Sequence, residues 1–253
     1  MPFFSSTPRL AGRGSVPAFV ALFAIGAVGV ASTLLVLPEV PGVPRPLLLI
    51  NPAILLAVGT LLGFVFAGRV GWRSAVADRL RGVETTFSVL PAGRLAAIGI
   101  GAGFLIAVAD SLLLPWWQGA VPLGSMTEGW SPAALLVGLL YGGITEEIIF
   151  RWGLLSLGVW GLWKIAGRGT AAPSQTLVWI GIVSTALLFG LGHLPALQLA
   201  GAELDAPLVL RTVGLNMLAS ILFASAFVRH NLETAMLTHA GFHLGVAAAV
   251  LIL

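Results

Sequence analysis

The stretch GLLYGGITEEIIFRWGLL, Gly138–Leu155, decides the fold, because it places three ionisable side chains inside an apolar run long enough to cross a membrane. Glu147 and Arg151 are four residues apart, about one helical turn, so we expect them to form an ion pair inside the bundle. Glu146 points about 100° away from Glu147 on a helix and has no such partner there. Because ionisable groups at this depth cost free energy, Glu146 is a candidate for chemistry.

Composition identifies the class of protein. Of the 253 residues, 58% are hydrophobic and 9% are charged, whereas soluble domains average about 25% charged residues. The chain is therefore predicted to be an integral, multi-pass membrane protein with the lipid bilayer as its surroundings. The formal net charge of +3 is explained by membrane topology, and we expect no nucleic-acid partner. The chain has no Cys, which excludes disulfides and thiolate nucleophiles.

The apolar runs predict an all-α, polytopic transmembrane helix bundle of about seven spans, within a range of six to eight. The runs are 16–37, 47–67, 95–114, 132–163, 177–194, 208–228 and 232–253. The fourth run would be about 48 Å long as a helix, against a hydrocarbon layer of about 30 Å. We expect it either to tilt and protrude or to break near Trp152 and Gly153. Pairs of glycines four apart, such as Gly59 and Gly63, indicate close helix packing.

The arginines predict the orientation of the chain in the membrane, and the motifs divide the chain into two parts. With a cytoplasmic N-terminus, nearly all of them fall in inside segments, which is the asymmetry of the positive-inside rule. In a prokaryotic cell this membrane would be the plasma membrane. We divide the chain into N-terminal membrane helices without motifs, 1–131, and a catalytic core, 132–253. Asp110 is expected at the interface, and Arg211 is expected to extend to the surface.

Three of the four histidines lie within apolar runs: His193, His239 and His243. His239 and His243 are four apart and share one face of the last helix. Buried imidazoles together with the unpaired Glu146 usually surround water, a proton path or a metal. These four side chains include donors that suit zinc, so a three-His, one-Glu zinc site stays open, as does a site without metal.

A different class of function is a proton-coupled transporter. Proton pathways also use buried Glu and His, but they require polar residues spread along the depth of several helices. Here the polar residues gather at one level of three helices, and no inverted repeat is evident, which favours an enzyme. The sequence does not distinguish an enzyme from a non-catalytic membrane scaffold of the same fold.

Three motifs, in order on three of the apolar runs, resemble those of the CPBP family. They are Glu146-Glu147-x-x-x-Arg151, Phe189-x-x-x-His193 and His239-x-x-x-His243. The family, also called Abi, comprises intramembrane proteases similar to the type II CAAX prenyl endopeptidases. The resemblance covers about residues 132–250.

The resemblance implies an endopeptidase that acts on a membrane-associated protein or peptide. It implies Glu146 as general base on water, His193 as its partner, and His239 with His243 as oxyanion donors, supported by Glu147, Arg151 and Phe189. The chemistry of these side chains agrees with those roles. Peptide hydrolysis without a Ser or Cys nucleophile needs a base that activates water and hydrogen-bond donors that stabilise the oxyanion.

The chain departs from the family pattern at two positions. Trp152 intervenes before Gly153, where the family commonly has Gly directly after the Arg, and His243 replaces the usual Asn. The family has been described both as metal-dependent and as glutamate-type. We expect no obligatory cofactor; if zinc binds, its ligands are Glu146, His193, His239 and His243. The sequence does not identify the substrate or show whether it is prenylated.

Overall fold

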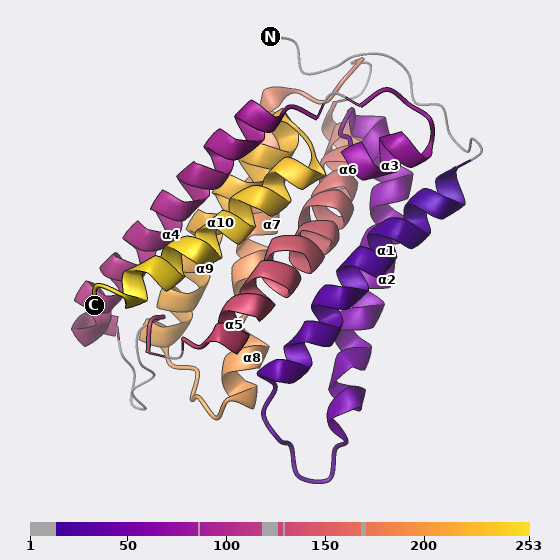
Figure 1. Ribbon diagram of the computed structural model, residues 1–253. Coiled ribbons are helices and arrows are strands. Elements are labelled where there is room, and N and C mark those ends of the chain that lie inside the picture. Colours follow the sequence, from indigo (N-terminus) through magenta and orange to yellow (C-terminus); the bar gives the residue numbers. More distant parts are fainter. Residues whose placement is uncertain (1–13, 86, 118–125, 129, 168–170) are drawn as a thin grey trace.

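The computed structural model describes residues 14–85, 87–117, 126–128, 130–167 and 171–253, and within these ranges it is an all-α bundle without a β-strand (Figure 1). The predicted fold class is confirmed. The helices are α1 (Ser15–Ser32), η1 (Thr33–Leu35), η2 (Arg45–Leu49), α2 (Ile50–Phe66), η3 (Ala67–Val70), α3 (Ala75–Leu80), α4 (Val89–Trp117), α5 (Pro132–Val137), η4 (Gly138–Leu155), α6 (Ser156–Ala166), α7 (Gln175–Leu191), α8 (Leu194–Leu199), α9 (Ala206–Arg229) and α10 (Leu232–Val250).

Six helical segments of the described residues are long and apolar enough to cross a membrane. They are Ser15–Leu35, Arg45–Val70, Val89–Trp116, Pro132–Ala166, Gln175–Leu199 and Ala206–Arg229. The 19-residue α10 is about 28 Å long and runs beside α4 through the bundle (Figure 1). It is less apolar because it carries Glu233, His239 and His243. The six candidate spans do not include α10, so the count lies at the lower end of the predicted range of six to eight.

Polar residues in the loops start the helices that carry the site. The side-chain oxygens of Ser131, Ser174, Asp205 and Asn231 each accept a hydrogen bond from the backbone N–H three residues later, at 2.9–3.4 Å. Such N-caps satisfy donors that the first helical turn leaves without a partner. They therefore fix where α5, α7, α9 and α10 begin.

The segments α5, η4 and α6 form one continuous helix from Pro132 to Ala166, 35 residues long. From Gly138 to Leu155 its turns are of the wider π type, in which backbone hydrogen bonds span five residues. Of the two sequence-based alternatives, the break near Trp152 and Gly153 is wrong. A β-carbon on Gly153 would lie 2.7 Å from the Gly59 Cα atom of α2, so this glycine permits close helix packing instead of ending the helix.

The π-wound helix η4 lies in the middle of the bundle, where α1 and α2 pack against it and so does α10 (Figure 1). Outside this layer α4 covers α10, and α7 packs against α9. The larger hydrophobic core surrounds η4 and includes Ile148, Trp152 and Phe227. Helices from the first 131 residues thus pack against two of the motif-bearing helices, η4 and α10, while the division of the chain at residue 131 stays a prediction.

The contact between α4 and α10 is made largely by backbone. A β-carbon at any of four glycines would overlap a backbone carbonyl oxygen of the opposite helix; these are Gly99 and Gly103 on α4, and Gly241 and Gly245 on α10. Small residues allow such close approach between membrane helices. The packing expected from glycines four apart is confirmed here.

A buried ion pair joins α4 to α9. Arg211 donates from Nε and Nη2 to the two carboxylate oxygens of Asp110, at 2.7 and 2.8 Å. Asp110 also accepts the backbone N–H of Met126 at 2.7 Å. Both side chains are buried, so the expectation that Arg211 extends to the surface is wrong, while the interfacial depth of Asp110 stays a prediction. The two residues neutralise each other between helices.

Candidate active site

Glu146 lies between two imidazoles from different helices. Its Oε1 atom is 3.9 Å from Nε2 of His193, and its Oε2 atom is 4.0 Å from Nε2 of His239. These separations exceed direct hydrogen-bond distances and suit bridging by a water molecule. The structure therefore brings together three of the four predicted catalytic side chains around one carboxylate.

His193 follows the end of α7, just before the short helix α8. Its Nδ1 atom is 2.8 Å from the carbonyl oxygen of Phe189. Because a carbonyl can only accept, Nδ1 carries a proton, and in the neutral ring Nε2 has a free lone pair directed toward Glu146. The His193 side chain is 33% exposed and that of Glu146 14% exposed, so this edge of the site is open.

Phe189 packs between the motif residues. Its ring centroid is 4.7 Å from that of His193 and 6.0 Å from that of His239. Phe150 of η4 packs edge-on against it at 5.1 Å, and the Arg151 guanidinium lies 4.7 Å from its ring centroid. One ring of α7 thus packs against residues of the other two motif-bearing helices, and its supporting role stays a prediction.

Glu147 is fully buried and has two partners. Its Oε1 atom is 3.3 Å from Nη1 of Arg151, the ion pair that the spacing predicts. The same oxygen is 2.8 Å from Nδ1 of His239. The second contact was not predicted, because nothing in the sequence relates Glu147 to a residue 92 positions later. Glu146 and Glu147 consequently face the two nitrogens of the same imidazole.

Two further residues of the site come from α9, which carries no motif. Arg151 donates from Nη2 to the backbone oxygen of Ser220 at 3.2 Å and to its hydroxyl at 2.9 Å. The Phe223 ring stacks on His239 with centroids 4.0 Å apart and planes inclined by 18°. Sequence reasoning missed both residues, since a Ser and a Phe in an apolar run are typical of any membrane helix.

His243 lies on the other side of His239 and against the glycine face of η4. The two imidazoles are stacked with centroids 5.0 Å apart. A β-carbon on Gly138 would lie 2.6 Å from His243 Nδ1, and one on Gly142 would lie 2.5 Å from Nε2. Nε2 is buried and has no hydrogen-bond partner among the described residues. These glycines therefore make room for a site residue, beyond their expected role in helix packing.

The four side chains do not form a metal-ligand set in this arrangement. Among the described residues, no group of three His, Asp or Glu side chains is placed so that it could hold a metal ion. Nδ1 of His193 contacts Phe189 and Nδ1 of His239 contacts Glu147, while the Nε2 atoms of both rings lie toward Glu146. The zinc site left open by the sequence stays a hypothesis.

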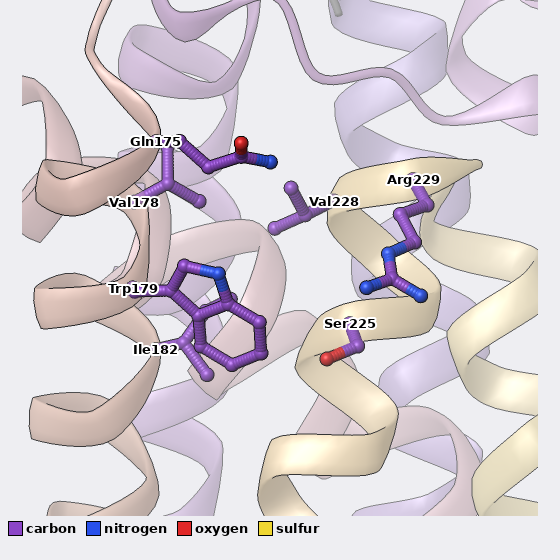
Figure 2. A pocket seen from close by; sticks show the side chains of 7 residues that line it. All are labelled: Gln175, Val178, Trp179, Ile182, Ser225, Val228 and Arg229. Atoms are coloured by element: carbon purple, nitrogen blue, oxygen red, sulfur yellow. The ribbon is translucent and has the colours of Figure 1, made fainter. Parts of the chain in front are cut away.

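A small cavity of about 30 Å³ lies apart from these residues, between α7 and α9 (Figure 2). Its lining is mainly apolar and includes Val178, Trp179 and Ile182 of α7, with Ser225 and Arg229 at the C-terminal end of α9. Neither Glu146 nor any of the three site histidines lines it. The candidate chemistry is therefore outside this cavity.

Comparison with known proteins adds one finding. Residues 128–245 match the family model of the Rce1-like type II CAAX prenyl endopeptidases. The match includes all three motifs and confirms the resemblance predicted from them. At the level of the family it supports a CAAX-type intramembrane protease, and with six apolar helices the chain is an integral, multi-pass membrane protein. No curated protein and no solved structure matched the chain.

Proposed function

We propose that this chain, whose residues 128–245 carry the Rce1-like pattern, is an endopeptidase that hydrolyses a peptide bond of a membrane-associated substrate, with Glu146 as the general base. The observation that carries the proposal is the position of the Glu146 carboxylate, 3.9 and 4.0 Å from the Nε2 atoms of His193 and His239. A carboxylate beside two imidazoles can take, hold and return a proton.

In the first step, Glu146 activates water. A water molecule between Glu146 and His193 would donate one proton to each lone pair, since His193 Nε2 is the unprotonated nitrogen of the neutral ring. Glu146 takes one proton as the water oxygen attacks the scissile carbonyl carbon. His193 accepts the other hydrogen bond and orients the water.

His239 carries the proton to the leaving group. Its Nδ1 contacts Glu147, so Nε2 of the neutral ring has no proton and can receive one from Glu146 Oε2, 4.0 Å away. Glu147 stabilises the imidazolium that forms, as a buried carboxylate does for a catalytic histidine. When the carbon–nitrogen bond breaks, His239 gives this proton to the amine. The hydroxyl from water stays on the new carboxyl group.

His243 supplies a donor for the oxyanion in this proposal. The buried Nε2 atom of His243 has no hydrogen-bond partner among the described residues and lies beside the His239 ring. An imidazole N–H donates as an Asn amide does, so the role survives the substitution that distinguishes this chain from the family pattern. While protonated, His239 adds a second donor.

The substrate and orientation complete the proposal. A protein or peptide tail held at the membrane would reach the site from the bilayer, and a prenylated CAAX tail is the first candidate because of the family match. The N-terminus is placed in the cytoplasm by the arginine asymmetry. No metal is required by the steps above.

The test compares purified wild type with Glu146→Gln on a prenylated CAAX peptide, alongside mass spectrometry of membrane peptides from cells with and without the protein. Glu146→Gln keeps size and hydrogen bonding but removes the base, so turnover falls by about 10²–10⁴ while the folded protein persists. Full turnover by Glu146→Gln contradicts the proposal.

The same preparations test for metal. Metal content and chelator sensitivity are measured for wild type and for His243→Asn, which restores the usual residue of the family. We expect His243→Asn to retain or raise activity without a change in bound metal. Joint loss of a bound metal and of activity would identify His243 as a ligand instead of an oxyanion donor.

A further inference from the structure

Helix α9 carries none of the three motifs, yet it contacts the site through two buried residues one helical turn apart, Ser220 and Phe223. We propose that these are positioning residues that hold the His239 imidazole with its proton on Nδ1, toward Glu147, and with Nε2 toward Glu146. The inference rests on the proposed function, because it explains how His239 is kept ready to receive a proton.

Phe223 determines the plane of the imidazole. Its ring lies 4.0 Å from that of His239 with planes inclined by 18°, and the His243 ring lies 5.0 Å from that of His239, also at 18°. His239 is therefore stacked with two rings. This stacking opposes tilting of the imidazole but accommodates its two flipped orientations equally. Another contact must choose between them.

Ser220 makes that choice through Arg151. The serine hydroxyl and backbone oxygen accept from one guanidinium nitrogen, Nη2, at 2.9 and 3.2 Å. The other terminal nitrogen, Nη1, lies 3.3 Å from Glu147 Oε1. Since a guanidinium is planar and rigid, holding one end fixes the other. Ser220 thereby fixes the cation beside the carboxylate that binds His239.

The cation determines which imidazole nitrogen is protonated. The proposal takes Glu147 as ionised because the Arg151 guanidinium lies 3.3 Å from its Oε1 atom, and an ionised carboxylate oxygen only accepts hydrogen bonds. The nitrogen 2.8 Å from that oxygen, Nδ1 of His239, is then the one that carries a proton. In a flipped ring Cδ2 would face Glu147 and Cε1 would take the place of Nε2, so the lone pair that the proposed proton transfer uses would no longer face Glu146. A ring with its proton on Nε2 would lack that lone pair altogether.

The first experiment reads the tautomer without an activity assay. Histidine is labelled with ¹⁵N in the full-length protein in lipid nanodiscs, and the His239 resonances are assigned by their loss in His239→Gln. We expect wild-type His239 to be protonated at Nδ1 and unprotonated at Nε2. Phe223→Leu and, more weakly, Ser220→Ala should give a mixture of tautomers, because Ser220→Ala keeps the backbone acceptor. Ser220→Thr keeps the hydroxyl and should behave as wild type.

Matched controls lie on the same helix. Phe227 is as buried as Phe223 but packs on Trp72 and Trp152, and Ser225 lines the separate cavity of Figure 2. Phe227→Leu and Ser225→Ala should leave the His239 resonances unchanged. Phe227→Leu should nevertheless lower thermal stability as much as Phe223→Leu does, which separates positioning from general packing.

The second experiment measures kcat and KM on a cleaved substrate for the same variants. Misplacement of a reacting group by about 1 Å costs up to about 100-fold, so Phe223→Leu should lower kcat by 10- to 100-fold with little change in KM. Phe227→Leu should keep the wild-type kcat. Rescue of kcat by Ser220→Thr relative to Ser220→Ala would support the hydroxyl contact.

The outcomes separate the two proposals. Wild-type His239 protonated at Nε2, or resonances that respond equally to Phe227→Leu and Phe223→Leu, overturns the positioning role even if Glu146 is the base. A wild-type protein with the expected tautomer but with turnover unaffected by Glu146→Gln overturns the proposed general base and leaves the positioning of His239 intact.

Discussion

Two buried arginine–carboxylate pairs in this bundle differ in how completely their atoms are satisfied. Asp110 and Arg211 form two hydrogen bonds at 2.7 and 2.8 Å, and Asp110 also accepts the Met126 N–H. Glu147 and Arg151 approach only at 3.3 Å through one oxygen. Glu147 Oε2 and Arg151 Nη1 have no hydrogen-bond partner among the described residues.

The difference indicates two uses of the same chemistry. A bidentate pair holds both groups in one geometry and joins α4 to α9. In the second pair each member also binds a third residue, His239 for Glu147 and Ser220 for Arg151. Incomplete satisfaction of buried polar groups is costly and needs an explanation, and at this place the explanation is an imidazole whose proton the pair controls.

The largest effect is expected for Arg151→Ala. It leaves Glu147 buried with only His239 as partner, and breaking a buried pair costs about 3–5 kcal/mol in soluble proteins. The variant should accumulate poorly, and the fraction that folds should also have reduced turnover. Thermal unfolding and activity per folded molecule measure the two losses. Normal amounts of the protein would show that Arg151 serves the substrate instead of the fold.

Arg211→Ala should lower stability as Arg151→Ala does, but it should not lower turnover per folded molecule. Asp110 would keep the Met126 N–H as its partner among the described residues. We therefore expect the free energy of unfolding to fall by a similar amount, about 3–5 kcal/mol. Turnover per folded molecule should equal that of wild type. The exposed Arg94 is the control, since Arg94→Ala should stay within about 0.5 kcal/mol. Reduced turnover in folded Arg211→Ala would remove the distinction between the pairs.

A smaller effect is expected where His243 meets the glycines of η4. The new methyl group of Gly142→Ala would press on His243 Nε2, and overpacking costs about 1–3 kcal/mol. His243→Asn shortens the side chain, so Gly142→Ala should be milder in that background. Gly158→Ala on the same continuous helix is the control, because a methyl group there meets no neighbour within 4 Å. Equal costs in both backgrounds would contradict the contact.

Reporter fusions sharpen the comparison without altering either pair. Asp110 and Arg211 lie near the ends of α4 and α9 that face outside when the N-terminus is cytoplasmic, whereas Glu147 and Arg151 lie inside a 35-residue helix. Fusions after Leu123 and Glu203 should report outside, and a fusion within residues 70–90 inside. If the reporters gave the reverse result, the N-terminus would lie outside and the predicted orientation would be wrong.

The sequence predicted contacts between residues of one helix from their spacing, but it did not predict most contacts between different helices. The Glu147–Arg151 pair follows from four-residue spacing, and three motifs in order indicated which side chains gather. Asp110 and Arg211, 101 positions apart, share no local pattern. Each was assigned separately to the membrane surface, because a single sequence does not show which charges meet.

The roles of small and aromatic residues were hidden for a related reason. Gly153 looked like a helix break, but its missing side chain serves contact with α2. Phe223 looked like ordinary core, and only the tertiary packing of α9 on α10 places its ring on His239. Because glycine and phenylalanine are frequent in membrane helices, their presence in the sequence does not indicate which of them make specific contacts.

The glycine contacts between α4 and α10 also restrict movement during a catalytic cycle. Four glycines meet opposing carbonyls with no space for a β-carbon, so sliding or rotation of α10 would drive backbone into backbone. His239 and His243 therefore lie on a helix that this packing holds in place. We expect substrate access and product release at the other edge of the site, where His193 follows the end of α7 and is more exposed than Glu146 and His239. Cross-links that lock α4 to α10 should leave turnover intact, whereas a lock on α8 should stop it.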